Sequence, residues 1–310
     1  MDRKSKTVVV LGGTGHYGRQ VVRNLVADGQ TVRVLSRHPD SAREKLGSQV
    51  DIIAGDLVDG TSVPAALDGA DAMVVCVSAF SRKLIRRLRE IEVDGVLAAF
   101  DAAEKAGVKR VVYLSVYELD LDFAARYGQV LAPMKKQVED ALASSSLNWT
   151  VFGAPPAMDI FFAFIRGTKL MVPGGGPPAL PTISVHDVGT ILAQAAVRED
   201  LGGQRFRLAG PEPMSFPEAA DRIGRIWDMN IKFKKVPLAI PRIVGSVVGV
   251  FVPYVGQIAR SLCMLNNFPQ RLVDDIPADH QRLRETFDYI PLTINDEAGL
   301  RKPGDKISHG

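Results

Sequence analysis

A glycine-rich loop near the start of the chain constrains the fold more than any other feature of the sequence. The loop follows a β-branched run at 7–11, which predicts a buried strand, and precedes an amphipathic stretch at 19–29, which predicts a helix. Its glycines satisfy both the G-x-G-x-x-G and the G-x-x-G-x-x-G spacing: Gly12, Gly13, Gly15 and Gly18. Strand, glycine loop and helix in this order predict a turn that admits a dinucleotide pyrophosphate to the backbone. A tight turn without a nucleotide is the alternative.

The end of the second expected strand, at 31–36, indicates which dinucleotide would bind. An NAD site usually has Asp or Glu about 20 residues after the glycines to bind the ribose 2′-hydroxyl. This chain has Arg37 there, a guanidinium suited to a 2′-phosphate, so we expect NADP(H). A solvated loop arginine is the alternative. Further cofactor contacts are expected in the glycine loop and after the third and fourth strands: Thr14, His16, Tyr17, Asp56, Leu57, Val77 and Ser78.

The first 150 residues alternate short β-branched runs with helical stretches. Strands are expected at 7–11, 31–36, 50–55, 72–77, 110–115 and 148–153. This alternation predicts an α/β fold, a doubly wound parallel sheet with helices on both faces. We expect a nucleotide-binding domain over 1–155 and a smaller, mostly helical substrate region over 156–310, with part of 181–210 returning to the sheet. In that region Ser215 and Glu218 predict a capping box, and Asp187 is expected to be an N-cap.

Composition excludes several function classes. The net charge of +3 over 310 residues is too small to indicate nucleic acid, and no metal-ligand spacing occurs. Cys76 and Cys263 lie far apart, one of them in an apolar run, so free thiols in a reducing compartment are expected. No room for a signal peptide precedes the first strand, and we expect a cytoplasmic protein.

One apolar segment, at 240–256, raises the question of a membrane. Its unbroken run of apolar and small residues, 243–252, is far shorter than the roughly 20 residues of a spanning helix. We therefore expect no stable membrane insertion. A buried or cavity-lining helix is the main interpretation, and an interfacial patch is the alternative.

Seven stretches between residues 8 and about 220 match one family in order, among them "VLGGTGHYG", "VRVLSRHPDSAREKL", "AAEKAGVKRVVYLSV", "KKQVEDALASSSLNWTVF" and "RFRLAGPEPMSFPEAA". The chain resembles the atypical short-chain dehydrogenase/reductases, specifically the NmrA-like and isoflavone-reductase-like NAD(P)H-binding proteins. The resemblance implies a Rossmann domain, with a smaller C-terminal region over the nicotinamide end of the cofactor. Residues 221–310 match much less specifically.

The same resemblance identifies a catalytic candidate. Short-chain reductases share a Tyr-x-x-x-Lys pair in which the Tyr protonates a carbonyl and the Lys holds the nicotinamide ribose. Matching this family places the lysine at Lys135, but Leu131 stands where the tyrosine would be. The isoflavone-reductase-like branch also lacks this tyrosine and is understood to use the lysine itself. Lys136 is an adjacent alternative, and a solvated basic helix start is another.

Four other side chains are weaker catalytic candidates. Ser115 ends the fifth expected strand, next to the place of the family's serine, although a local hydrogen bond would also explain it. Tyr117 or Tyr127 could supply a displaced phenol, but neither has helical spacing to Lys135. His186 is expected near the mouth of the site, as a candidate for acid–base chemistry.

These features favour an NADPH-dependent reductase of a small hydrophobic organic substrate. An apolar substrate chamber is expected from Phe161, Phe162, Phe164, Phe251 and Tyr254. The alternative is a non-catalytic NADP(H)-binding sensor or interaction protein of the NmrA type, which the missing tyrosine favours. A sugar-nucleotide epimerase is disfavoured because it needs that tyrosine most. A protein partner or a second copy of the chain is left open.

Overall fold

The computed structural model describes residues 5–305, except for the side chains of Val244 and Val250. Its main feature is a seven-stranded sheet in the order β3-β2-β1-β4-β5-β6-β9, in which all neighbouring strands are parallel. The strands are β1 (Thr7–Leu11), β2 (Thr31–Ser36), β3 (Asp51–Ala54), β4 (Ala72–Val75), β5 (Arg110–Val116), β6 (Trp149–Ala154) and β9 (Gln204–Arg207). The expected doubly wound α/β fold is confirmed.

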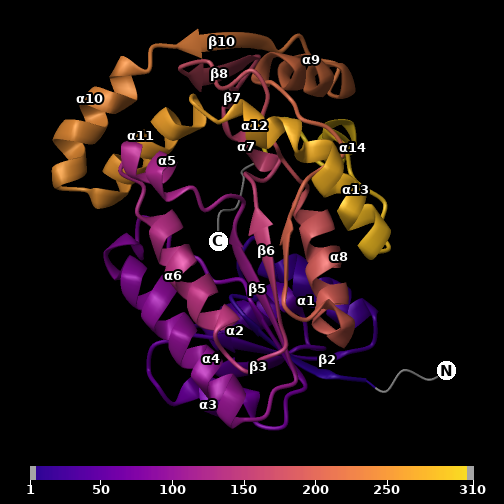
Figure 1. Ribbon diagram of the computed structural model, residues 1–310. Coiled ribbons are helices and arrows are strands. Elements are labelled where there is room, and N and C mark those ends of the chain that lie inside the picture. The colour runs from indigo at the N-terminus through magenta and orange to yellow at the C-terminus, as the bar shows by residue number, and fades with distance from the viewer. Residues whose placement is uncertain (1–4, 306–310) are drawn as a thin grey trace.

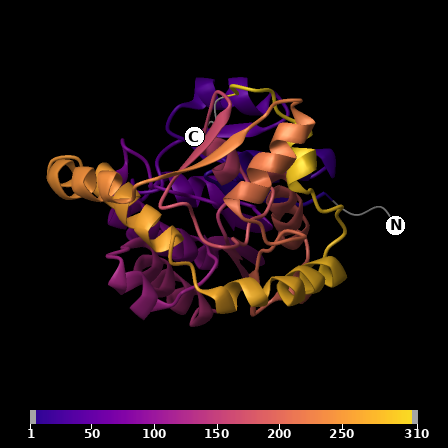
Figure 2. The ribbon, with the colours of Figure 1, turned by 90° about the horizontal axis from the view of Figure 1, so that it is seen from above.

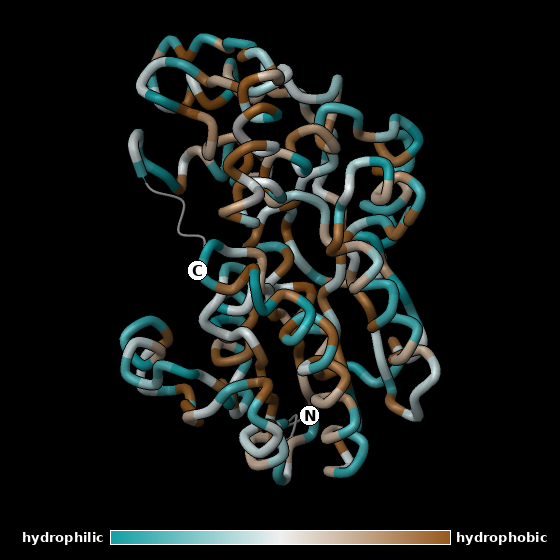
Figure 3. The backbone as a smooth tube through the Cα atoms, turned by 90° about the vertical axis from the view of Figure 1, so that its left-hand side faces the viewer, coloured by the Kyte–Doolittle hydropathy of each residue, from teal (hydrophilic) through white to brown (hydrophobic). Residues whose placement is uncertain are grey.

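Helices cover both faces of this sheet (Figure 1). One face packs on α1 (Gly18–Ala27), α2 (Pro39–Leu46), α8 (Val185–Ala196) and α13 (Ile276–Thr286). The other packs on α3 (Ser62–Leu67), α4 (Gly95–Lys105) and α6 (Leu131–Ala143). Both interfaces are built from buried Val, Leu, Ile and Ala, as expected for strands that are covered on two sides. Apolar segments of the chain run mainly through the interior (Figure 3).

The C-terminal part contains a second, smaller sheet, which the sequence pattern does not predict. Its order is β10-β8-β7, from β7 (Ile165–Arg166), β8 (Lys169–Pro173) and β10 (Lys232–Val236). The remaining helices are α5 (Leu121–Arg126), α7 (Asp159–Ala163), α9 (Phe216–Ile226), α10 (Ala239–Val247), α11 (Pro253–Leu265), α12 (Gln270–Asp274) and α14 (Ile294–Gly299). β9 and α8 belong to the main sheet and its cover, while α7, α9 and α14 share a separate core with β8. A domain boundary at residue 155 stays a prediction.

Two helix starts test the expected caps. Ser215 and Glu218 form the complete capping box at the start of α9, as predicted. At α8 the prediction was wrong, because Ser184 is the N-cap and its side chain accepts the His186 N–H. Asp187 lies inside the first turn, where it is buried and accepts the Leu292 N–H at 3.0 Å.

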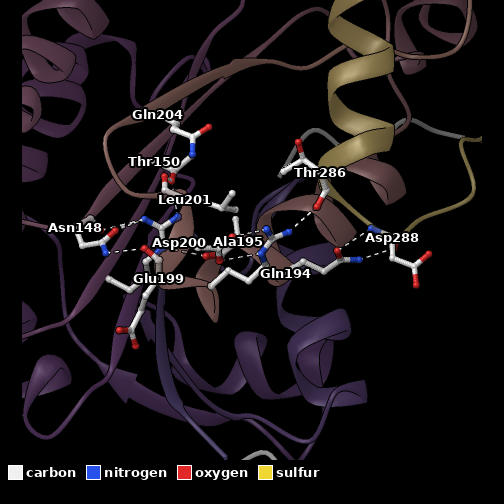
Figure 4. A network of polar contacts seen from close by, with 12 residues as sticks. Asn148, Thr150, Gln194, Ala195, Glu199, Asp200, Leu201, Gln204, Thr286 and Asp288 are labelled. Carbon is white, nitrogen blue, oxygen red and sulfur yellow. Dashed lines mark hydrogen bonds and ion pairs between the residues drawn. The ribbon is translucent and has the colours of Figure 1, made fainter.

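A buried arginine connects the amino end of β5 to its neighbours. Arg110 is fully buried and donates to the Ala195 carbonyl at 3.0 Å and to the Asn148 side chain at 2.8 Å. It also bonds to Thr150, whose hydroxyl in turn donates to Leu201. Figure 4 shows these partners converging from β6, α8 and the turn before β9. Burial lowers the pKa of Arg110 to about 10.

Helix α10, the first part of the apolar segment at 240–256, departs from the main expectation. Helix α10 is not buried: the side chains of Ile240, Ile243 and Val247 are 55%, 63% and 61% exposed. Viewed from above, α10 is the outermost helix at one side of the molecule (Figure 2). Among residues 5–305, none of the helices combines the length and apolarity required to cross a bilayer.

Candidate functional site

A cavity of about 1080 Å³ lies at the carboxyl ends of the central strands, beneath the C-terminal helices. The sheet supplies residues that directly follow β1, β2, β3, β4 and β5, which is where open parallel sheets bind their ligands. The opposite wall comes from α7, α11 and the segment leading into α12. Of the predicted cofactor residues, those on the cavity wall are Gly12, Thr14, Gly15, His16, Tyr17, Arg37, Asp56, Leu57, Val77 and Ser78.

The glycine loop fits a pyrophosphate. Gly12 has φ +83°, and a Cβ there would lie 2.7 Å from the Cys76 carbonyl oxygen. A Cβ at Gly13 would lie 2.7 Å from Val34, and one at Gly18 would collide with the Gly12 carbonyl. These three glycines are therefore required by the turn and by helix–strand packing.

Gly15 differs from the other three glycines of the loop. A Cβ there would meet only the Gly12 carbonyl oxygen, at 3.1 Å, and Gly15 itself lines the cavity. A side chain at this position would therefore project into the cavity. Helix α1 begins three residues later, so its free N–H groups and positive dipole end lie beside the loop. The loop is a cradle for an anionic group.

Arg37 and Asp56 lie at neighbouring strand ends on the cavity wall. Arg37 is exposed after β2, and no ion pair is recorded for it in the described part of the chain. Its guanidinium is available to an anion. Asp56 instead has protein partners: its carboxylate lies 3.7 Å from the Arg87 guanidinium and accepts the Val58 N–H at 3.5 Å.

His16 connects the glycine loop to the C-terminal part of the chain. Its Nε2 lies 2.8 Å from the Asp159 carboxylate, at the start of α7. The other Asp159 oxygen accepts from Arg301 at 2.5 Å, and Arg301 also contacts the buried Glu297 at 3.1 Å. Sequence reasoning missed Asp159 and Arg301, because no local pattern links positions so far apart in the chain.

Lys135 is buried and already paired. Its ammonium lies 2.8 Å from the Glu92 carboxylate and 4.9 Å from the centroid of the Tyr113 ring. The other Glu92 oxygen accepts the Ala79 N–H at 2.7 Å. Burial alone would lower the pKa of Lys135, but Tyr113 and Glu92 beside it outweigh burial and raise that pKa. Lys136 is on the surface, paired with Asp140 at 2.5 Å.

The catalytic candidates differ in their access to the cavity. Within residues 5–305, Lys135, Ser115 and His186 are not among the residues that line it, whereas Tyr117 and Leu131 are. The Ser115 hydroxyl is buried without a hydrogen-bond partner among the described residues.

Tyr117 lines the cavity with its hydroxyl already engaged. That hydroxyl donates to Asp279 at 3.0 Å and lies 3.3 Å from the Leu272 carbonyl oxygen. Burial, followed by the Asp279 charge, raises the pKa of Tyr117. The phenol therefore stays protonated at neutral pH, with its proton directed at the Asp279 carboxylate.

The apolar wall differs in part from the expected one. Phe164 and Tyr254 line the cavity as predicted. The prediction was wrong for Phe161 and Phe162, which are buried in the core around α9, and for Phe251, which is 76% exposed. The apolar wall is instead formed mainly by one face of α11 and the residues after it: Ile258, Leu262, Met264, Leu265, Phe268 and Leu272.

A thiolate nucleophile and a bound metal ion are two further possibilities for a site of this kind. Burial raises the pKa of the cavity-lining Cys76 thiol to about 12, so it is not a thiolate at neutral pH. No cluster of His, Cys, Asp or Glu capable of holding a metal ion occurs among the residues that the structure describes.

Two named relatives match about three quarters of the chain. An NAD(P)H azoreductase from Xenophilus azovorans is 26% identical over 236 residues, 74% of this chain and 77% of the relative. A Photosystem II assembly factor, Ycf39 from Synechocystis, is 24% identical over 250 residues, 79% of this chain and 74% of the relative.

A solved structure resembles almost the whole chain. It is the NADPH-dependent quinone oxidoreductase QOR2 of Escherichia coli in complex with NADPH. The TM-score is 0.74 at 16% identity, and the alignment covers 94% of this chain and 99% of the other. At that identity the likeness shows the fold alone. A family model described as NAD(P)H-binding matches residues 12–199, more than half of the sequence, and the chain therefore belongs to this NAD(P)H-binding family.

Proposed function

We propose that this protein is an NADPH-dependent reductase of a small hydrophobic organic substrate. The observation that carries the proposal is the continuity of the cavity. One end contains Gly15 and Arg37, and the other contains Ile258, Leu262 and Phe268. A site that joins an anion cradle to an apolar chamber brings a dinucleotide and an apolar molecule together.

The chain's own residues would hold the cofactor at one end of the cavity. The backbone of the glycine loop would bind the pyrophosphate, and Arg37 would bind a 2′-phosphate through charge-assisted hydrogen bonds. Val77 and Ser78, which follow β4 on the cavity wall, would border the rest of the cofactor. When bound, such a cofactor supplies a hydride.

Lys135 has a positioning role in this proposal. The Lys135–Glu92 pair fixes the Ala79 N–H, and through it the segment that carries Val77 and Ser78. A direct contact between Lys135 and the ribose, which the family resemblance implies, stays a prediction.

The protonation step limits the substrate class. Leu131 occupies the place of the family's proton donor, and the Tyr117 hydroxyl is bound to Asp279. A substrate whose hydride adduct is a delocalised anion needs no protein acid, because water can protonate that anion. Quinones, enones and azo compounds have this property, whereas simple ketones do not. Hydride plus one proton from water then gives the two-electron-reduced product and the oxidised cofactor.

The relatives support the same class. One is an azoreductase by name, and the QOR2 structure is that of an NADPH-dependent quinone oxidoreductase. Both act on conjugated acceptors, which agrees with the limit that the protonation step sets. Neither comparison assigns a substrate to this chain.

The proposal is tested by following NADPH absorbance with a panel of quinones, enones, azo dyes and simple ketones. We expect turnover of conjugated acceptors and none of ketones. Gly15→Val should abolish turnover through cofactor binding, since its added atoms enter the cavity. Leu262→Trp should lower turnover of bulky acceptors while leaving NADPH affinity unchanged. Tight NADPH binding without turnover of any conjugated acceptor would overturn the proposal.

A cofactor-binding interaction protein is the second candidate. It is favoured by Leu131, which stands where the resemblance would place a tyrosine, and by the relative that is named as an assembly factor. This protein would bind NADP(H) and pass its redox state to a partner. The NADPH oxidation panel separates the two candidates, because a sensor holds the cofactor without consuming it.

We also propose that the protein functions in the reducing environment of the cytoplasm. Both cysteines are free thiols, Cys76 buried and Cys263 half-buried. Free thiols persist in a reducing compartment. Fluorescence microscopy of a tagged full-length chain would test this location.

A further inference from the structure

The segment that contradicted the sequence expectation, α10 with the turn η4 (Val248–Val250), presents an apolar row to solvent. Ile240, Ile243 and Val247 follow i, i+3, i+7 spacing, so they lie on one face of the helix. Phe251 continues the row four residues later, just after η4. All four side chains are more than half exposed. A contiguous row of this kind usually marks an interaction surface.

The outward direction of this row is set by packing. Helix α10 forms a hairpin with α11, and the two backbones approach each other through small residues. A Cβ at Gly249 would lie 2.7 Å from the Gly256 Cα, and one at Gly245 would collide with Ala259. Because the inner face has room only for glycine and alanine, the large apolar side chains cannot turn inward.

The segment that contains the hairpin carries charge of one sign. From 229 to 273 the sequence contains no Asp or Glu but six Lys or Arg residues. Five of these are exposed and have no ion pair recorded in the described part of the chain: Lys232, Lys234, Lys235, Arg242 and Arg260. Arg271, the sixth, is paired with Asp120. An exposed apolar row with unpaired cations beside it is complementary to an anionic lipid surface.

The same charges disfavour a second copy of the chain as the occupant. Two copies joined through this row would bring their unpaired cations together without an acidic residue from either segment to offset them. A bilayer instead supplies phosphate headgroups to the cations and acyl chains to the apolar side chains.

We infer that α10 and η4 attach the protein reversibly to the surface of an anionic bilayer. Ile240, Ile243, Val247 and Phe251 enter the boundary between headgroups and acyl chains, and Arg242 and the β10 lysines contact the phosphates. In attachment of this kind the helix lies in the plane of the membrane interface and does not cross the bilayer. The inference is independent of the proposed reduction.

Co-sedimentation of the full chain with vesicles tests this inference. We expect binding to phosphatidylcholine vesicles that contain phosphatidylglycerol, weak binding to phosphatidylcholine alone, and release by salt. Ile243→Asn with Phe251→Asn should weaken binding at least about tenfold. Lys234→Glu with Lys235→Glu should also weaken it. Ile290→Asn is the matched control, because Ile290 is 86% exposed at another part of the surface.

Two measurements keep the outcome unambiguous. Unchanged NADPH affinity and melting temperature show that the variants are folded. Absence of binding to phosphatidylglycerol vesicles, or equal binding by the Ile243/Phe251 variant, would overturn the inference. A dimer by light scattering that the same variant dissociates would assign this face to a second copy and would overturn it as well.

Discussion

The ammonium of Lys135 lies 2.8 Å from the carboxylate of Glu92, and both side chains are buried beside the cofactor end of the sheet. Glu92 belongs to a π-helical turn, Glu90–Asp94, a geometry often found at functional positions. Through Ala79 the pair connects α6 to the segment after β4. Lys135, the catalytic candidate that the family resemblance identifies, is therefore engaged in an ion pair.

This relationship predicts that Lys135 and Glu92 act together. Lys135→Met should lower the free energy of unfolding by about 3–5 kcal/mol, because it leaves a buried carboxylate unpaired. If Lys135 only positions the 77–79 segment, Lys135→Met and Glu92→Gln should weaken NADPH binding by similar factors. Isothermal titration with NADPH and urea unfolding measure the two effects.

The matched control for this prediction is Lys136→Met, which removes the neighbouring charge from an exposed pair with Asp140. It should change stability by less than about 1 kcal/mol. A loss of NADPH affinity in Lys135→Met that Glu92→Gln does not reproduce would show instead that Lys135 contacts the cofactor directly.

The predicted cofactor end of the site rests on local signals. The glycines of the loop and Arg37 are each specified by their position relative to a strand, and the structure places them on or against the cavity wall. The capping box at Ser215 was predictable for the same reason.

The parts that could not be predicted depend on distant partners. Glu92 acquires its role from Lys135. Asp159 acquires its role from His16 and Arg301. No spacing rule links these positions in the sequence. The apolarity of α10 is evident in the sequence, but apolarity alone does not show whether a helix face is covered. That depends on which elements pack against it, and α10 packs mainly against α11.

Arg37 should determine the choice of cofactor. Arg37→Ser removes a bidentate partner of a 2′-phosphate, and we expect NADPH affinity to fall about 10- to 100-fold while NADH affinity is unchanged. Calorimetric titration with NADPH, NADP+, NADH and NAD+ checks this. Arg43→Ser, on the exposed side of α2, is the control. Equal affinity of the unaltered protein for NADH and NADPH would contradict the assignment.

Asp187 should make stability depend on pH. Burial, followed by repulsion from Glu297 and Asp296 and opposed by the Leu292 N–H, raises the pKa of Asp187 from 3.8 to about 7. Between pH 3.8 and about 7, the folded state therefore holds the Asp187 proton whereas the unfolded state has lost it. Stability from this group is full below pH 3.8 and is lost as the pH rises to about 7. The total loss is on the order of 4 kcal/mol.

Urea unfolding across this pH range, with Asp187→Asn as the variant, measures that effect. The amide oxygen can still accept the Leu292 N–H, so the variant should lose less stability than the unaltered protein as the pH rises. Asp288→Asn, at an exposed position, should follow the unaltered protein. Parallel pH profiles for Asp187→Asn and the unaltered protein would show that Asp187 ionises normally.

Arg110 should be essential for stability and irrelevant to the cofactor. Arg110→Met would leave the Ala195 and Asn148 carbonyls and the Thr150 hydroxyl without their donor in a buried setting. We expect a loss of about 2–4 kcal/mol in the free energy of unfolding. NADPH affinity should be retained, because Arg110 begins β5 and the cavity lies at the other end of that strand. Lys109→Met removes the same charge from an exposed neighbour and should change the free energy of unfolding little. An equal loss of stability in both variants would mean that charge, not the buried hydrogen bonds, stabilises this end of the sheet.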